Sequence, residues 1–280
     1  MPAPVTPPRF NADYRHNPPR LSRTIARRLG EQGRVVLRVL VGTGGNAERA
    51  TKYVSDGSKI VAGNPDLDPA HSWNFDVGGE YATRDVFLGV NLFHKEISGV
   101  IEEVDTGIKK GGKSVFQVEN VGDGWTRGID LEQRLTFGFT GIGALEGLQL
   151  WANETLLESR VKLDDPNAKE RCFKQQPNFM ANLGLDYTYA PWGTTVTAAL
   201  SYVAERRDFK VSGDVTSINP SATLDLSVRQ RIYKGLSVFG EADNVTNERK
   251  VESEALANGS STRKVESAGR TFLVGLNVQF

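Results

Sequence analysis

The side chains that most often perform chemistry are sparse in this sequence of 280 residues. Cys172 is the single cysteine, which excludes an internal disulfide and a cysteine-based structural zinc site. The three histidines, His16, His71 and His94, lack the spacing of metal ligands. No serine, histidine and aspartate share a local context typical of nucleophilic catalysis. We therefore expect no catalytic residue, no metal site and no cofactor, and a function other than an enzyme's.

A glycine pattern follows the apolar run near residue 40. Gly42, Gly44 and Ala47 match the first half of a dinucleotide-binding fingerprint. That fingerprint requires a helix to open at once, but the next residues, ERATKYVSDG, are rich in turn and β-branched residues and have no apolar helical stripe. We therefore interpret GTGGN as a hairpin turn.

Two charged stretches could bind ions or surfaces. Asp164 and Asp165 could hold a cation, although two adjacent acids before a proline are more typical of a solvated loop. Four arginines crowd one short stretch: Arg20, Arg23, Arg27 and Arg28. They could dock on acidic headgroups or nucleic acid, but a solvated helix face is the more common explanation.

The charge balance excludes broad electrostatic binding. The sequence has 34 basic and 34 acidic side chains, so no positive field gathers nucleic acid. No run of about 18 apolar residues occurs, which excludes an α-helical membrane span and leaves a β-barrel open. The first twenty residues lack the apolar core of about 7 to 15 residues that a secretory signal peptide needs, which leaves the route of export open.

The amino-terminal part predicts a small α+β segment. Residues 1–16 are a proline-rich lead. Leu21 to Gly30 has a possible cap, two apolar residues four apart and a glycine stop, which predict a short basic helix. Gly33 to Val41 is rich in β-branched residues and predicts a strand, with a return strand over 47–54. The residue pattern changes to a long series of alternating strands after this segment, so we place the domain boundary between Ala50 and Gly63.

From about residue 60 the chain alternates apolar and polar residues. The pattern is most regular where Leu183, Leu185 and Tyr187 face one way and Gly184, Asp186 and Thr188 the other. Between Ser72 and Phe280 we count about nine or ten such strands. Their lengths of roughly 9 to 13 residues suit tilted strands that cross a hydrocarbon layer. The fold class is therefore mainly β, a partial antiparallel transmembrane barrel.

Aromatic residues and the last strand fit this interpretation. Several aromatic residues fall near strand ends, where an interfacial girdle is expected: Trp73, Tyr81, Trp125, Trp151, Tyr187, Tyr189, Trp192 and Tyr202. Tight turns such as APWG and YKGL alternate with longer polar loops. The final strand carries an apolar signature on one face: Phe272, Val274, Leu276, Val278 and Phe280.

Residues 60–280 resemble the distal barrel of TonB-dependent outer-membrane receptors. The resemblance lies in GNPDLDPAHSWNFDVGGEY at 63–81, VENVGDGWTRGIDLE at 118–132, EADNVTNE at 241–248 and GRTFLVGLNVQF at 269–280. It implies an outer-membrane location and energy-coupled uptake of nutrients such as iron-siderophore complexes. It also implies outer-membrane lipid, proteins of the TonB system and the barrel-assembly machinery as partners.

Residues 17–54 resemble part of the carboxyl-terminal domain of TonB-type energy transducers. The resemblance lies in NPPRLSRTIARRLGEQGRVVLRVLV at 17–41 and GGNAE at 44–48. The domains expected are thus a lead (1–16), a partial transducer-like segment (17–54) and a receptor barrel (60–280). The alternatives to a receptor are a periplasmic interaction module and a nonfunctional truncated fusion.

The receptor hypothesis assigns roles to the two faces of the strands. The apolar faces meet lipid, and the polar faces line a lumen with Asp130, Glu132, Arg134, Asp186, Asp225 and Arg229.

Overall fold

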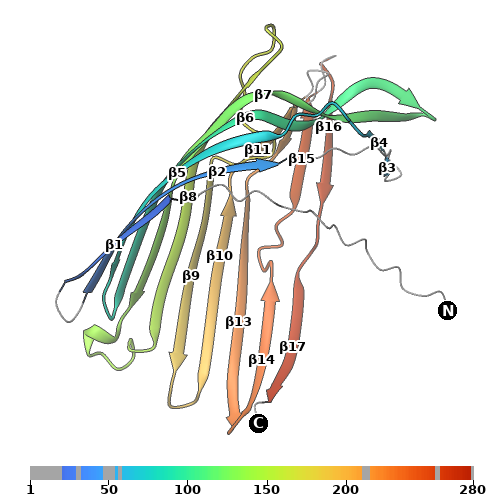
Figure 1. Ribbon diagram of the computed structural model, residues 1–280. Helices are drawn as coiled ribbons and strands as arrows, with labels where there is room; N and C mark the ends of the chain where they lie inside the picture. The colour runs from blue at the N-terminus through green and yellow to red at the C-terminus, as the bar shows by residue number, and fades with distance from the viewer. Residues whose placement is uncertain are drawn as a thin grey trace.

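The protein is described from a computed structural model, which covers residues 21–29, 33–46, 54–55, 59–209, 215–255 and 259–278. Its main sheet is a continuous antiparallel path, curved like an open trough (Figure 1). The strands in path order are β1 (Leu21–Leu29), β2 (Gly33–Asn46), β5 (Ala70–Ala82), β6 (Val86–Lys110), β7 (Lys113–Thr136), β8 (Leu148–Leu163), β9 (Phe179–Tyr189), β10 (Thr194–Val203), β13 (Ser221–Tyr233), β14 (Leu236–Asp243) and β17 (Thr271–Val278). From β5 onward the path has nine strands, which agrees with the prediction of about nine or ten alternating strands after Ser72.

The connections differ between the two ends of the sheet. At the lower end in Figure 1, β9 and β10 are joined by Ala190 to Gly193, and β13 and β14 by Lys234 and Gly235. Gly235 has a φ of 73°, which a tight turn requires and glycine adopts without strain. The 3-10 helix η1 (Gly138–Thr140) lies in the longer turn between β7 and β8. The predicted tight turns APWG and YKGL are confirmed.

The upper end carries long connections with strands of their own. A second, four-stranded antiparallel sheet forms there from β11 (Arg206–Phe209), β12 (Val215–Ile218), β15 (Lys250–Ala255) and β16 (Ser261–Glu266). Two short strands, β3 (Val54–Ser55) and β4 (Lys59–Ala62), pair with each other, and β4 also runs parallel to β7. The upper end is therefore where side chains from distant parts of the chain meet.

The register separates the main sheet into two faces. Val77, Leu92, Ile129 and Leu156 are successive cross-strand partners on β5 to β8, and all four side chains are exposed. A second row continues across the remaining strands: Leu150, Leu185, Ala198, Leu226, Ala242 and Phe272. Large apolar side chains exposed in continuous rows mark a surface that meets an apolar partner or lipid. The predicted alternation is confirmed.

Few apolar side chains of the described residues are buried. They are Ala62, Leu67, Val100, Val115, Val161, Ala181 and Ile218. Most lie at or near the upper end, so the side chains described here form no central apolar core in the hollow of the sheet. The sheet is held by ladder hydrogen bonds and cross-strand pairs, which are the elements that stabilise a barrel wall.

The predicted amino-terminal helix is wrong. Residues Leu21–Leu29 form β1 and pair with β2 at nine successive positions, from Leu21 opposite Val41 to Leu29 opposite Gly33. The helix prediction depended on local propensity, which is a weak preference. The long ladder with β2 outweighs this preference, because its hydrogen bonds satisfy backbone groups along the whole segment.

The hairpin turn predicted at GTGGN is also wrong. β2 continues through it to Asn46, and Gly42 and Gly44 lie in the ladder opposite Asn74 and Ser72 of β5. A dinucleotide-binding turn is thereby excluded at these glycines. The proline-rich lead and most of the predicted return strand lie outside the described residues.

No helix in the described part of the chain is long and apolar enough to cross a membrane.

Candidate functional site

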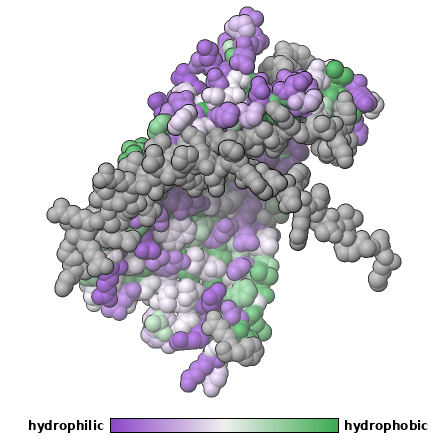
Figure 2. Space-filling view, in the orientation of Figure 1, coloured by the Kyte–Doolittle hydropathy of each residue, from purple (hydrophilic) through white to green (hydrophobic). Residues whose placement is uncertain are grey.

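The hollowed face of the main sheet carries polar side chains, and Figure 2 shows hydrophilic residues on the part of it that is in view. Asp130 on β7 accepts hydrogen bonds from Thr155 Oγ1 at 2.8 Å and from Asn91 Nδ2 at 3.4 Å. Asp186 on β9 accepts from Thr197 Oγ1 at 2.6 Å and from Trp151 Nε1 at 3.0 Å. These pairs join adjacent strands side by side. The face is thus lined by polar groups that are mutually hydrogen bonded.

A cavity of about 500 Å³ lies on this face between β5 and β8. Asp76, Glu80, Asp130 and Glu132 contribute carboxylates to its lining. The other predicted lumen residues share the face: Arg134 lies over the Phe87 ring at 5.6 Å, and Asp225 Oδ1 accepts from the Asn244 amide at 2.7 Å. The register also places Arg229 on this face, opposite Phe239.

One aromatic residue differs from the prediction. Trp151 is on the hollowed face, where its ring packs over Gly184 and its indole N–H bonds Asp186, so it is not part of an outward girdle. A Cβ built on Gly184 would meet the Trp151 ring at 2.0 Å, so only glycine fits there. Trp73, Tyr81, Tyr189 and Trp192 are exposed, as a girdle requires.

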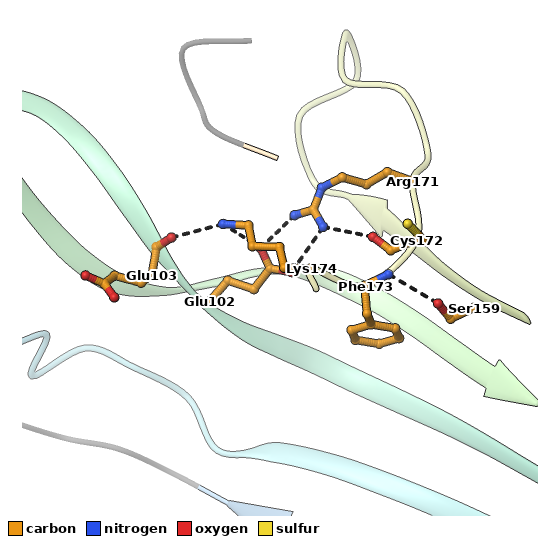
Figure 3. A network of polar contacts seen from close by, with 7 residues as sticks. All are labelled: Glu102, Glu103, Ser159, Arg171, Cys172, Phe173 and Lys174. Carbon is orange, nitrogen blue, oxygen red and sulfur yellow. Dashed lines mark hydrogen bonds and ion pairs between the residues drawn. The ribbon is translucent and has the colours of Figure 1, made fainter. Parts of the chain in front are cut away.

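The upper end holds the most enclosed group of charges, drawn in Figure 3. Arg171 donates from Nη1 to Glu102 Oε1 at 3.2 Å and from Nη2 to Glu102 Oε2 at 2.6 Å. Lys174 Nζ lies 3.0 Å from the same Oε2 and donates to the Glu103 carbonyl at 3.1 Å. The side chains of Glu102 and Arg171 are only 8% and 11% exposed. A carboxylate this buried is stabilised by two cations that hold it from two sides.

The network also orders the connection between β8 and β9. Arg171 donates to the Cys172 carbonyl at 3.1 Å, and its guanidinium lies 5.2 Å from the Phe209 ring of β11. The Phe173 amide donates to the buried Ser159 hydroxyl at 3.2 Å. Lys59 of β4 pairs with Glu103 at 2.5 Å. A single arginine therefore joins β6, the β8–β9 connection and the small sheet.

A cavity of about 780 Å³ opens beside this network. Its lining combines both charges with apolar surface, including Glu119, Asp164, Asp165, Lys169, Glu170, Arg171, Lys174 and Phe209. Asp165 Oδ1 accepts from the Asn167 amide at 2.9 Å, which is the loop geometry predicted for this acidic pair. Within the described ranges no group of three or more His, Cys, Asp or Glu side chains could hold a metal ion.

A smaller cavity of about 500 Å³ contains Cys172, Glu205 and Arg207. The Ser217 hydroxyl and then the Arg207 guanidinium hydrogen bond to Glu205 and hold the pKa of that carboxyl below its usual 4.5. The same contact raises the pKa of Arg207. The pair ties the end of β10 to β11 and β12 and fixes the edge of the small sheet.

Two of the sequence segments singled out above come together at this end. Asn120 Oδ1 accepts from the Asp68 amide at 2.8 Å, and Asn120 Nδ2 donates to the Asp68 carbonyl at 3.0 Å. Asn64 Nδ2 donates to the Val118 carbonyl at 3.0 Å. Leu67 between them is fully buried. The segments at 63–81 and 118–132 thus act as one structural unit below the loops.

The charge network was not predicted from the sequence. Glu102 and Arg171 are 69 residues apart and sit in segments without regular alternation, so no local pattern links them. Four residues of the predicted signature are exposed on one face of β17: Phe272, Val274, Leu276 and Val278. Phe280 lies outside the described residues.

The family model for the TonB dependent receptor-like β-barrel matches residues 8–245. The match runs through residues 17–54, and none of the comparisons supports a transducer-like segment there, so that segment stays a prediction. The register agrees with the match, because β2 pairs with β5 at thirteen positions within one sheet. The domain boundary between Ala50 and Gly63 stays a prediction. A search of curated protein sequences finds no match.

Solved structures with a similar fold include receptors for ferric siderophores. A mutant of the ferric enterobactin receptor PfeA from Pseudomonas aeruginosa, in complex with enterobactin, has a TM-score of 0.60 and 19% identity over 93% of this chain. The ferric yersiniabactin uptake receptor FyuA from Yersinia pestis has a TM-score of 0.59 and 18% identity over 92%. The siderophore receptor PirA from Acinetobacter baumannii has a TM-score of 0.60 and 15% identity over 93%. The chain spans 40%, 37% and 41% of the length of these receptors, in that order.

Proposed function

The chain belongs to the TonB dependent receptor-like β-barrel family, and we propose that it forms the distal wall of an outer-membrane barrel that imports ferric siderophores. The observation that carries the proposal is the two-faced main sheet. Continuous rows of exposed apolar side chains cover one face, and hydrogen-bonded polar side chains cover the other. A barrel wall between lipid and an aqueous lumen needs this arrangement.

The asymmetry of the connections supports an orientation in the membrane. Short turns at the lower end suit the periplasmic side, and the long connections with their small sheet suit the cell surface. Trp192 and Tyr189 pack edge to face with ring centroids 5.3 Å apart beside the lower turns. Amphipathic rings at this level anchor a barrel at the headgroups.

The loop-end cavity supports binding of a small charged ligand. Its volume of about 780 Å³ is within the range of sites for drug-sized molecules. Its charges are held in place before any ligand arrives, because Arg171 and Lys174 are fixed on Glu102. The similar receptors are named for ferric enterobactin and ferric yersiniabactin, and we propose a ligand of this class.

A role in transport, and not in catalysis, is what we propose from the family of the chain. The family is one of receptors and transporters, and we propose no enzymatic activity for the chain. Its proposed partners are outer-membrane lipid, a TonB-type transducer that supplies energy, and the assembly machinery that receives the exposed apolar face of β17. We propose Phe272, Val274, Leu276, Val278 and Phe280 as the signature of that last strand.

The test begins with location. Outer membranes and soluble fractions from native cells are searched by mass spectrometry for peptides that span residues 45–65. Gel migration with and without heating reports whether the chain is a folded barrel. We expect the peptides in the outer membrane, a heat-dependent shift, and uptake of a radiolabelled ferric siderophore that stops when the transducer is deleted. A chain found only in the soluble fraction, or uptake that does not change when the gene is deleted, would contradict the proposal.

A further inference from the structure

The loop-end cavity of about 780 Å³ has more acidic than basic side chains in its lining. Its five acidic side chains are Glu102, Glu119, Asp164, Asp165 and Glu170, and its three basic side chains are Lys169, Arg171 and Lys174. The apolar part of the lining includes Val104, Val121, Leu163, Phe209 and Val215. The charge that a ligand meets depends on which of the acidic and basic groups already have a partner.

Two of the three basic side chains are occupied. Arg171 donates to both carboxylate oxygens of Glu102, and Lys174 Nζ lies 3.0 Å from one of them (Figure 3). The side chains of Arg171 and Glu102 are almost fully buried. Turning either cation toward an anionic ligand would leave this buried carboxylate with less compensation, which is unfavourable. Arg171 and Lys174 are therefore poorly suited to bind an anion.

Glu119 has no such cation. It lies directly opposite Glu102 in the ladder between β6 and β7, and both side chains line the cavity. Glu119 is half-buried, and no described residue forms a hydrogen bond or an ion pair with its carboxylate. Like charges directly opposite each other on a sheet are destabilising. A cation that enters the cavity beside Glu119 relieves this repulsion.

The remaining charges of the lining add to the negative side. Glu170 pairs with Arg160 at 3.3 Å. The carboxylates of Asp164 and Asp165 have no cationic partner among the described residues, and Lys169 has no anionic partner among them. Three acids against one base are thus left for a ligand, and the two aspartates are the more exposed of these acids.

Resting on the proposed function, we propose that the cavity selects ferric siderophores that carry a free ammonium or guanidinium group, and that Glu119 binds this group. The group donates a charge-assisted hydrogen bond to the Glu119 carboxylate, while the apolar part of the lining contacts the organic part of the chelate. A negative group at the same point of a ligand is repelled by Glu119. The cavity therefore discriminates by charge among ligands of the same size.

The test uses the full chain in outer membranes and three probes that share one iron chelate. They are a linear ferric trihydroxamate with a free terminal amine, the same chelate with the amine acetylated, and the same chelate with the amine succinylated. At neutral pH these probes carry one positive charge, no net charge and one negative charge. Binding of each radiolabelled probe is measured at a fixed salt concentration. The amine form should bind about tenfold more tightly than the acetylated form, since one charged hydrogen bond amounts to roughly that change, and the succinylated form should bind most weakly.

Two variants of Glu119 test its role in the preference. In Glu119→Gln, the ratio of the affinities for the amine and acetylated forms should fall from about tenfold to near unity. In Glu119→Lys, the succinylated form should become the most tightly bound. Glu96→Gln is the matched control, because it makes the same change on β6 at a residue that is 54% exposed and outside the lining. This control should keep the preference, and heat-dependent gel migration shows whether each variant is folded.

An anionic chelate, a ferric tris-catecholate, separates the inference from the proposed function. Binding of the tris-catecholate without binding of the amine form would overturn the preference for a cation and leave the proposed function intact. Equal affinities for the amine and acetylated forms, or a preference that persists in Glu119→Gln, would overturn the inference as well. A folded chain that binds none of the four chelates would contradict the proposed function itself.

Discussion

Arg171 holds Glu102 by two hydrogen bonds, at 3.2 and 2.6 Å, across 69 residues of sequence. The pair joins β6 to the connection between β8 and β9, and the stacking of Arg171 on Phe209 extends it to the small sheet. Lys174 shares the same carboxylate. The loops above the barrel wall are therefore organised around one buried negative charge with two cations.

Arg171→Ala should loosen these loops. Removing one partner of a buried ion pair leaves an uncompensated charge, which costs roughly 3 to 5 kcal/mol, and we expect about 3 because Lys174 still faces Glu102. Hydrogen exchange of the amides in β11 and of residues 171–174 measures the change in opening free energy. The matched control is Arg160→Ala, whose exposed pairing with Glu170 should contribute less than about 1 kcal/mol. Equal effects of the two variants would contradict the role given to Arg171.

Leu185→Arg should destabilise the barrel. Leu185 lies in the exposed apolar row between Leu150 and Ala198, and an arginine facing the bilayer midplane costs about 2 to 4 kcal/mol. Urea unfolding in lipid vesicles gives the free energy. Asp186→Asn, one residue away on the polar face, should change it by less than about 1 kcal/mol because the amide keeps an acceptor for Thr197 or Trp151. A larger loss of unfolding free energy in Asp186→Asn than in Leu185→Arg would mean that Asp186 faces the lipid and Leu185 faces the lumen.

Gly184→Ala should disrupt the packing of Trp151. The added methyl would lie 2.0 Å from the indole ring, so the ring must move and its hydrogen bond to Asp186 is lost. Overpacking of this kind costs about 1 to 3 kcal/mol. Gly240→Ala is the matched control, because the nearest atom to its Cβ is 3.9 Å away. Unfolding midpoints that fall equally for both glycines would show that backbone entropy and not the ring sets the effect.

Local alternation was enough to predict the wall of the barrel. A period of two residues is a property of each strand alone, so the outward placement of Leu183 and Leu185 follows from the sequence. The same rule accounts for the predicted polar face that carries Asp130 and Asp186. Trp151 was misplaced because its aromatic type was given more weight than its position in the alternation.

Features that depend on which segments pair, and not on the local pattern of residues, were not predicted. Leu21–Leu29 has the composition of a short helix, and only its ladder with β2 makes it a strand. Strands β6 and β7 are 25 and 24 residues long and form one hairpin. They extend well past the alternating part of the sequence, because their upper halves also pair with each other. Glu102 lies in that upper half, so its pairing with Arg171 required the structure.

The small sheet should weaken in acid. Ser217 and Arg207 lower the pKa of Glu205, and Lys264 lowers the pKa of Glu266. A carboxyl with a depressed pKa stabilises the fold above its unfolded pKa of 4.5, and that contribution is lost as the pH falls through the lower folded value. Protection of the amides of β12 and β15, corrected for intrinsic exchange, should be constant from about pH 8 to about pH 5 and fall below that.

Glu205→Gln isolates the cause of this acid step. The neutral amide still accepts from Ser217 but no longer titrates, so the decrease in protection at β12 should be smaller in the variant, while β15 keeps the part due to Glu266. Lys250 and Lys264 do not contribute to it, because Glu252 and Glu266 raise their pKa above 10.5 and such a contribution disappears only as the pH rises further. A decrease at β12 that is as large in Glu205→Gln as in the parent would assign the acid step to groups other than the Glu205 carboxyl.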